Sequence, residues 1–261
     1  IALSYGSCQL LDQIGVWHGV APFATAINTI HVSDRGHFGF TEMHADKEGL
    51  PFLGNVIELA DAGRVFHKSL SQAKNISLFC PAFVTDITRA TDKVTLTLND
   101  GQTLTTKLMV AADGALSSCC DMVGISRHEH DFEQVALIAN ITTSLPHQGK
   151  AFERFTESGP VALLPMSEGR SSLVWCVKPQ DVPALIELSD HAFADKLQAI
   201  FGWRLGKLLH VGQRNSYPLI LRQATQLISH RFAAVGNAAQ TLHPIAGQGF
   251  NLGLRDVITL A

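Results

Sequence analysis

The sequence lacks an excess of charge of either sign, and it lacks a long hydrophobic run. Its 261 residues carry 20 Lys and Arg against 23 Asp and Glu, which gives a formal net charge of -3. The sequence therefore has no excess of basic residues of the kind that nucleic-acid-binding proteins carry. No apolar run approaches the ~18–20 residues of a membrane span, and no internal repeat indicates a solenoid or a propeller. We therefore expect a globular protein that binds no nucleic acid.

Cysteine is also scarce, and its spacing suits neither cross-linking nor metal binding. The count of five is odd, Cys119 and Cys120 are adjacent, and no Cys-x-x-Cys spacing occurs. This pattern favours neither a disulfide framework nor a zinc site. His128 and His130 flank Glu129, but no second cluster accompanies them to complete a metal site. We expect reduced thiols in a cytoplasmic protein, and no metal site.

What is present is a large apolar fraction, arranged in two kinds of pattern. Hydrophobic residues make up 46% of the chain and charged residues 16%, enough at this length to build a core. Short β-branched and aromatic runs predict strands at 76–80, 83–89, 94–98 and 103–111, and again at 135–143, 150–156, 161–166 and 171–177. Helical patterns follow at about 183–201 and 249–260. The expected class is mixed α/β with an inserted antiparallel sheet.

The most informative segment spans residues 232–256. A short strand runs into a tight turn of small residues, a bend at Pro244 and a glycine pair, Gly247 and Gly249, that opens a helix. A helix start presents unpaired backbone N–H groups and the positive end of the helix dipole, and glycines keep side chains away from those amides. The segment therefore predicts a site for an electron-rich oxygen or for a ring that accumulates negative charge.

This segment resembles the second flavin motif of the class A flavoprotein monooxygenases of the para-hydroxybenzoate hydroxylase type. The matching residues are Gly236, Ala238, Ala239, Pro244, Gly247, Gln248, Gly249, Asn251, Gly253 and Asp256. Asn237 and Gln240 stand where the family usually has aspartate and histidine. The resemblance implies that Asn237 reaches the ribityl chain of FAD, that Pro244 lies beside the isoalloxazine, and that the amides of Phe250 and Asn251 face its pyrimidine edge.

A second motif, Asp113-Gly114, follows the strand predicted at 103–111 and resembles the Asp-Gly motif of the same family, which serves FAD and NAD(P)H. The carboxyl end of such a strand is where α/β folds bind ligands. Cys120 occupies the position that normally holds an arginine, so the contact to the pyridine nucleotide departs from the family pattern. Taken alone the motif indicates a turn; its place about 120 residues before Gly236 connects it with the flavin motif.

Other stretches, among them 31–37, 151–156, 163–167 and 201–207, resemble the 2-octaprenyl-6-methoxyphenol hydroxylases, a branch of the family that serves ubiquinone biosynthesis. The resemblance implies that NAD(P)H reduces FAD, that O2 gives a flavin C4a-hydroperoxide, and that one oxygen passes to a prenylated phenol. It further implies a cytoplasmic enzyme, peripheral to the inner membrane, in a ubiquinone-biosynthesis complex. Another ubiquinone-pathway hydroxylase or an alkene-epoxidising member of the family is the alternative.

The resemblance also implies a domain organisation. An FAD-binding domain is expected from 1–27, 54–130 and 223–261, and a β-rich substrate domain from 28–53 and 131–222. The β-rich domain should supply an apolar pocket, for which Phe155, Leu163, Pro165 and Trp175 are the candidates. Ordinary core packing is the competing interpretation for each of them. No residue is indicated as a general base.

The Gly-x-Gly-x-x-Gly fingerprint with which this family opens does not occur in the sequence. We therefore expect a piece that begins about fifty residues into the family pattern and ends just after the second flavin motif. Such a piece should bind FAD poorly and be inactive by itself. A catalytically silent domain kept for partner binding or assembly is the alternative from another class, and an intact fingerprint in the upstream coding sequence would remove its main support.

Overall fold

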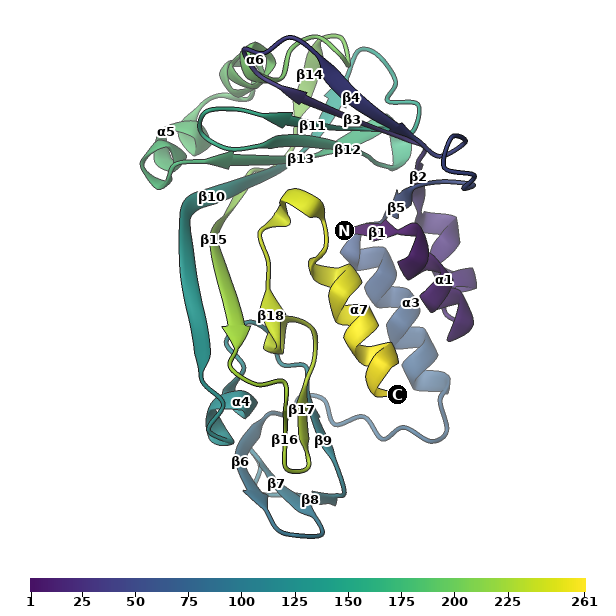
Figure 1. The fold of residues 1–261 in the computed structure, drawn as a ribbon, viewed down its shortest axis with the longest axis vertical. Helices are drawn as coiled ribbons and strands as arrows, with labels where there is room; N and C mark the ends of the chain where they lie inside the picture. Colours follow the sequence, from purple (N-terminus) through teal and green to yellow (C-terminus); the bar gives the residue numbers. More distant parts are fainter. The chain divides into compact units, whose positions relative to one another are not determined.

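The computed structural model describes residues 1–261, with the side chain of Ala246 left out, and it divides the chain into two compact units (Figure 1). The first unit contains Ile1–Phe66 and Phe132–Leu219, and the second contains His67–Asp131 and Ile220–Ala261. The two units are defined by which residues pack together, whereas the predicted domains are defined by the ligand that each is expected to bind. The assignment of 1–27, 54–130 and 223–261 to flavin binding therefore stays a prediction.

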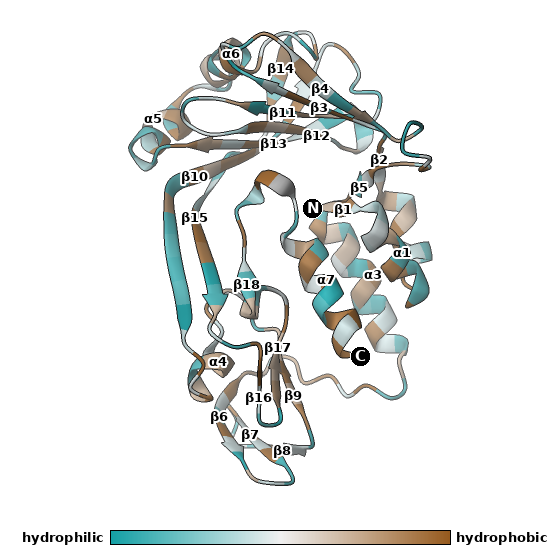
Figure 2. Ribbon diagram, viewed as in Figure 1, coloured by the Kyte–Doolittle hydropathy of each residue, from teal (hydrophilic) through white to brown (hydrophobic). Residues whose placement is uncertain are grey.

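The first unit is built on an antiparallel sheet with one parallel pair. Its strands, in spatial order, are β10 (Arg127–Thr143), β13 (Arg170–Val177), β12 (Val161–Pro165), β11 (Lys150–Phe155), β3 (Thr29–Asp34) and β4 (Phe40–His44). Strand β11 pairs in parallel with β3, and β14 (Leu208–Val211) pairs with β10. Figure 2 shows that β10 begins hydrophilic and becomes hydrophobic farther along the chain. The four strands predicted between 135 and 177 are confirmed.

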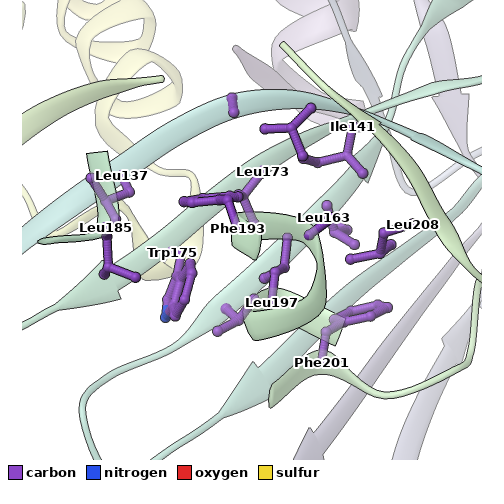
Figure 3. Packing of buried hydrophobic residues seen from close by; sticks show 14 of the residues in the cluster. Leu137, Ile141, Leu163, Leu173, Trp175, Leu185, Phe193, Leu197, Phe201 and Leu208 are labelled. Carbon is purple, nitrogen blue, oxygen red and sulfur yellow. The ribbon is translucent and has the colours of Figure 1, made fainter. Parts of the chain in front are cut away.

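One face of this sheet is covered by α5 (Val182–Glu187) and α6 (Asp190–Phe201). Side chains that alternate along the strands meet the helices there, as Leu173, Trp175 and Val177 do on β13. The Trp175 ring packs edge-on against Phe193 of α6, with 5.5 Å between ring centroids. Figure 3 shows Leu173, Trp175 and Phe193 close together in this cluster. This cluster is the main core of the first unit.

The single helix predicted at about 183–201 is wrong in one respect, because the structure has two. Leu188 is extended, with ψ 147°, and ends α5. The Ser189 hydroxyl then accepts a hydrogen bond from the Ala192 amide and starts α6 as its N-cap. Gly202, with φ 89°, ends α6 in a conformation that favours glycine.

The opposite face of the sheet carries two smaller apolar clusters. The first contains Ile27, Ile30, Val56, Ala151, Leu164 and Met166, and the second contains Phe132, Ala136, Val174, Cys176 and Leu219. Ile27 and Val56 come from the small sheet of β1 (Ala2–Ser4), β5 (Gly54–Val56) and β2 (Thr25–Ile27). The helices α1 (Tyr5–Gln13), α2 (Trp17–Val20) and α3 (Leu59–Gln72) complete this part of the chain.

The second unit combines a three-stranded antiparallel sheet with a second, partly parallel one. Strands β6 (Val84–Arg89), β7 (Val94–Leu98) and β8 (Thr103–Thr106) form the first, and β16 (Ile228–Ser229), β17 (Phe232–Ala234) and β9 (Met109–Ala111) form the second. The remaining elements are α4 (Ser118–Met122), α7 (Gly249–Leu260) and the pair of β15 (Asn215–Ala224) with β18 (Gln240–Thr241). The buried residues of this unit form a core of their own.

The strand predicted at 76–80 is wrong. Residues 76–80 form no regular element, and the large side chains of Ile76, Leu78 and Phe79 are exposed. A β-rich composition does not make a strand where no neighbouring strand takes up the backbone hydrogen bonds. Among the described helices, none has both the length and the apolar character needed to cross a bilayer.

Candidate functional site

The two sequence motifs lie at neighbouring strand ends in the second unit. Strands β9 and β17 pair in parallel, with Ala111 in register with Ala234. The pairing extends one step further, since the Val235 amide donates to the Ala111 carbonyl at 3.0 Å. Asp113-Gly114 follows β9 and Gly236-Asn237 follows β17. The fold therefore brings both motifs to the same edge, at the carboxyl ends of parallel strands, where α/β sheets bind ligands.

Asp113 organises the loop after β9. Its carboxylate accepts hydrogen bonds from the Ser117 hydroxyl and from the Cys119 amide, the latter at 3.0 Å. Burial by itself raises the pKa of Asp113, but these hydrogen bonds outweigh burial and hold the pKa below its ordinary value. Gly114 has φ 91°, a left-handed conformation that favours glycine. The motif thus fixes the start of α4 and keeps a carboxylate charged at the strand edge.

Small residues after β17 allow close packing of this edge. Ala238 and Ala239 are each 1% exposed and share a cluster with Cys119 and Cys120 of α4. The Cys120 thiol lies 3.8 Å from the Ala238 carbonyl oxygen, although the two residues are 118 positions apart. Larger side chains at 238 and 239 would push α4 away from the turn. The structure therefore gives the two alanines a packing role, and any ligand contact would come from their backbone.

Helix α7 is fastened to the turn by two further residues of the motif. The Gly236 amide donates to the Asp256 carboxylate at 3.2 Å. A Cβ on Gly253 would lie 3.0 Å from the Gly236 Cα, so the helix approaches the turn more closely than a side chain would comfortably allow. Gly253 and Asp256, in the middle of α7, thus hold the helix against the turn that contains Gly236.

The loop before α7 is held by its own side chains. Gly247 has a left-handed backbone conformation, with φ 59°. Its carbonyl oxygen accepts a hydrogen bond from the side-chain Nδ2 of Asn251 at 2.7 Å. The Ile245 amide donates to the His243 ring at 3.2 Å, and burial lowers the pKa of His243, so this ring is neutral at pH 7. Pro244 begins the short 3-10 turn between them. These two hydrogen bonds and the turn at Pro244 connect the loop to the start of α7.

The start of α7 has the properties that a flavin ring needs. In a helix the first backbone amides have no intrahelical acceptor, and they add to a positive dipole end. A Cβ placed on Gly249 would meet no atom within 4 Å, so this position faces open space. Gln248, Phe250 and Asn251 surround it in sequence at the helix start. The residues present therefore fit FAD by the chemistry of their donors, and their individual roles stay predictions.

The four candidates for the substrate pocket are not brought together. Leu163 and Trp175 are 0% and 2% exposed and lie inside the core cluster beneath α6 (Figure 3). Pro165 is buried two positions after Leu163, on the same face by strand alternation. Phe155 is 39% exposed and points to the opposite face of the sheet. Only Phe155 therefore presents its side chain outside the core, and the pocket assignments stay predictions.

Sequence reasoning missed one residue that the structure singles out. Glu153 lies on β11, next to Ala162 of β12 and Val32 of β3, on the face turned away from α6. Its Oε1 atom is buried and has no hydrogen-bond partner among the described residues. Burial raises the pKa of Glu153 to about 7. The sequence contains one signal for it. Along a strand, residues two apart share a face, so Glu153 lies on the same face as the apolar Ala151 and Phe155.

The raised pKa gives a testable effect on stability. The folded protein keeps the Glu153 proton up to pH about 7, whereas the unfolded chain loses it near pH 4.5. The folded state therefore binds more protons between these values, and its free energy of unfolding falls as the pH rises through that window. Glu153→Gln removes this cost, so it should stabilise the protein at pH 8 by roughly 2–3 kcal/mol and change little at pH 4. Urea unfolding at both pH values measures the effect.

Glu157→Gln is the matched control, because Glu157 is exposed in the next turn of the chain. It should leave the pH dependence of stability as in the parent protein. An equal change in the free energy of unfolding at pH 4 and pH 8 for Glu153→Gln would contradict the burial of an unpaired carboxyl at this position.

A comparison with protein families matches residues 2–261 to a family described as a FAD binding domain. Among curated proteins, the chain is 38% identical over 256 residues to ubiquinone hydroxylase UbiL of Rhodospirillum rubrum, covering 98% of this chain and 59% of the relative. It is 34% identical over 310 residues to the mitochondrial ubiquinone biosynthesis monooxygenase COQ6 of Xenopus tropicalis, covering 100% of this chain and 65% of the relative. The chain thus spans about three fifths of the length of these relatives.

Solved structures show the same fold. The p-nitrophenol 4-monooxygenase PnpA of Pseudomonas putida superposes with a TM-score of 0.80 at 18% identity, covering 99% of this chain and 67% of that chain. The expected fold class, α/β with an inserted antiparallel sheet of the para-hydroxybenzoate hydroxylase kind, is confirmed by this likeness.

Proposed function

This chain belongs to the FAD-binding domain family, and from that premise we propose that it is part of an FAD-dependent monooxygenase that hydroxylates a prenylated phenol in ubiquinone biosynthesis. NAD(P)H is the reductant and O2 the oxygen donor in this proposal. The names of the relatives support it, because UbiL is a ubiquinone hydroxylase and COQ6 a ubiquinone biosynthesis monooxygenase.

The observation that carries the proposal is the meeting of the two motifs at one edge. Asp113 and Gly236 follow paired parallel strands, and Gly253 and Asp256 hold the middle of α7 against the turn at Gly236. A structural turn alone needs no such convergence of a charged carboxylate, a helix start and a glycine facing open space. The residues that would hold FAD are Asp113, Gly114, Gly236, Asn237, Ala238, Ala239, Pro244, Gly247, Gln248, Gly249, Phe250 and Asn251.

FAD supplies the redox chemistry, taking a hydride from NAD(P)H and activating O2 for transfer to the ring. The chain's own residues bind and orient. The amides of Phe250 and Asn251, at the positive end of α7, would stabilise negative charge on the ring edge that faces them. Gly249, whose Cβ would meet no atom within 4 Å, leaves room for that ring. Burial lowers the pKa of His243, so its ring is neutral at pH 7 and adds no positive charge beside the helix start.

The substrate of the proposal is an aromatic ring with a hydroxyl group and an apolar tail. Phe155, with its exposed ring on the face away from α6, is the pocket candidate best placed to contact it. Leu163, Pro165 and Trp175 would act from beneath, by keeping the sheet rigid. A polyprenyl tail is strongly apolar, so the proposal places the enzyme in the cytoplasm at the surface of the inner membrane, in contact with the other enzymes of the pathway.

The visible absorption spectrum of the full-length protein, as purified, tests this function. We expect flavin bands that bleach under anaerobic conditions when NAD(P)H is added, and a hydroxylated product when O2 and a phenol with a short prenyl chain are then supplied. A protein that stays colourless with added FAD would overturn the proposal in favour of a catalytically silent domain. A reducible flavin with an epoxidised alkene as product would move it to another branch of the family.

A further inference from the structure

The first unit has a hollow on its surface that no step of the proposed reaction uses. Its volume is about 250 Å³, and it opens to solvent beside α6 and β14, which lie side by side (Figure 1). Drug-sized ligands occupy pockets of roughly 300–1,000 Å³, so this hollow is sized for a smaller group. The residues that line it are Asp195, Gln198, Ala199, Trp203, Lys207 and Leu208.

The loop at 202–207, between α6 and β14, is held in place by hydrogen bonds and gives the hollow a fixed wall. The Gln198 side chain spans the loop, because its Nε2 donates to the Gly202 carbonyl oxygen at 2.6 Å and its Oε1 accepts from the Leu208 amide at 2.8 Å. The Lys207 amide donates to the Ser144 hydroxyl oxygen at 2.7 Å. A ligand would therefore find the backbone of this wall already ordered, which lowers the entropy cost of binding.

Trp203 gives the hollow a large exposed aromatic side chain. It is 69% exposed. Leu145, itself 52% exposed, lies beside the same loop, since a Cβ on Gly206 would be 2.9 Å from the Leu145 Cγ. The face of an indole ring attracts ammonium groups, and tryptophan is also the side chain that is enriched where a bilayer meets water. The hollow thus combines an aromatic surface for a cation with an apolar neighbour.

The hollow contains one acidic and one basic side chain, and these do not pair with each other. Oδ2 of Asp195 contacts Nδ1 of His191 at 3.0 Å, while its Oδ1 has no partner among the described residues. The Lys207 ammonium likewise makes no hydrogen bond or ion pair within the described chain. One carboxylate and one ammonium are therefore both available to a ligand. The complement of this pair is a zwitterion, with an ammonium group and an anionic group of its own.

We propose that this hollow binds the headgroup of a phospholipid that carries both an ammonium group and a phosphate. Trp203 and Asp195 hold the ammonium group, and Lys207 contacts the phosphate. The inference rests on the proposed function, which puts the enzyme at a bilayer surface. A lipid fits better than a free zwitterion because the exposed Leu145 and Trp203 suit the boundary between headgroups and acyl chains. The site would hold the first unit against the membrane in which a polyprenyl substrate dissolves.

Sedimentation of the full-length holoenzyme with vesicles tests the site. We expect wild type to bind vesicles of phosphatidylethanolamine and phosphatidylcholine, and to bind phosphatidylglycerol vesicles, which lack an ammonium group, more weakly. Trp203→Ala should weaken binding to the first kind about tenfold, because the aromatic contact to the ammonium group is lost. Asp195→Asn should bind both kinds equally. Phe38→Ala and Asp181→Asn are the matched controls, since both residues are exposed elsewhere in the first unit, and they should bind as wild type does.

Calorimetric titration with glycerophosphoethanolamine, the headgroup without its acyl chains, separates a bilayer from a soluble ligand. The free headgroup should bind wild type more weakly than vesicles do, compete with them, and lose its binding in Trp203→Ala. A free headgroup that binds as tightly as the vesicles would overturn the assignment to a lipid. Thermal unfolding of Trp203→Ala and Asp195→Asn should match wild type, because both side chains are mostly exposed.

Activity in the absence of vesicles distinguishes failure of the site from failure of the proposed function. Reduction of the flavin by NAD(P)H and hydroxylation of a water-soluble phenol should be the same in wild type and in Trp203→Ala. If these reactions occur but Trp203→Ala binds vesicles as wild type does, the lipid site is wrong and the function stands. A wild type that binds neither kind of vesicle would also overturn the site, in favour of a protein partner for Trp203. A protein without flavin whose vesicle binding depends on Trp203 would overturn the function alone.

Discussion

Replacing Phe193 with alanine is expected to lower the free energy of unfolding by about 3–5 kcal/mol. Phe193 is 0% exposed at the centre of the main core of the first unit. Its ring packs against Trp175, and the Arg214 guanidinium lies over it at 5.1 Å. Truncation removes the buried ring, leaves a cavity between α6 and the sheet, and takes away the aromatic face that Arg214 covers.

Chemical denaturation followed by tryptophan fluorescence measures this loss, because Trp175 reports directly on the packing of the cluster. Phe38→Ala is the matched control, since Phe38 is fully exposed in the turn between β3 and β4. It should change stability by less than about 0.5 kcal/mol. A loss below about 1 kcal/mol for Phe193→Ala would mean that the sheet and α6 do not form one packed core.

The second large effect is expected at the start of α7. Gly249→Val should weaken FAD binding by the full-length protein by roughly tenfold to a hundredfold, the ~1–3 kcal/mol that overpacking costs. The side chain meets no protein atom near its Cβ, so the fold should tolerate it. It would instead occupy the space that the proposed flavin needs. Fluorescence titration of the apoprotein with FAD gives the affinity, and thermal unfolding without FAD shows whether stability is unchanged.

Gly63→Val is the control, because it makes the same glycine-to-valine substitution in another helix. Gly63 is a helical glycine of α3 whose Cβ would also meet nothing within 4 Å, and it lies outside both motifs. Valine there should leave FAD affinity unchanged. Equal affinities in Gly249→Val and the parent protein would show that the flavin does not approach the start of α7.

Local patterns predicted most strands, but not which strands pair. The run 103–111 reads as one strand in sequence, yet the structure ends β8 at Thr106 and begins β9 at Met109. The break occurs because β8 pairs with β7 whereas β9 turns to β17, far along the chain. The choice of partner depends on tertiary packing, which no window of sequence contains.

Some residues of the candidate site could be recognised from the sequence, and others could not. Glycines, a proline and an Asp-Gly pair are recognisable because backbone geometry requires those residue types, as at Gly114 and Gly247. Glu153 could not be recognised, because a glutamate in a strand is buried only when its cross-strand neighbours are small and apolar, and Val32 comes from a distant part of the chain. Leu163 and Trp175 show the reverse difficulty, since apolar residues look alike in a core and in a pocket.

The parallel pairing of β9 with β17 also sets the order in which the protein can assemble during synthesis. Ala111 leaves the ribosome long before Ala234, and the strands β10, β11, β12, β13 and β14 of the first unit's sheet are made in between. Until β17 arrives, the β9 edge has open backbone groups that could pair with another chain. Contacts of such long sequence separation form slowly. The edge that we propose to bind FAD is thus among the last parts to close, so bound FAD would report that both β9 and β17 have found their places.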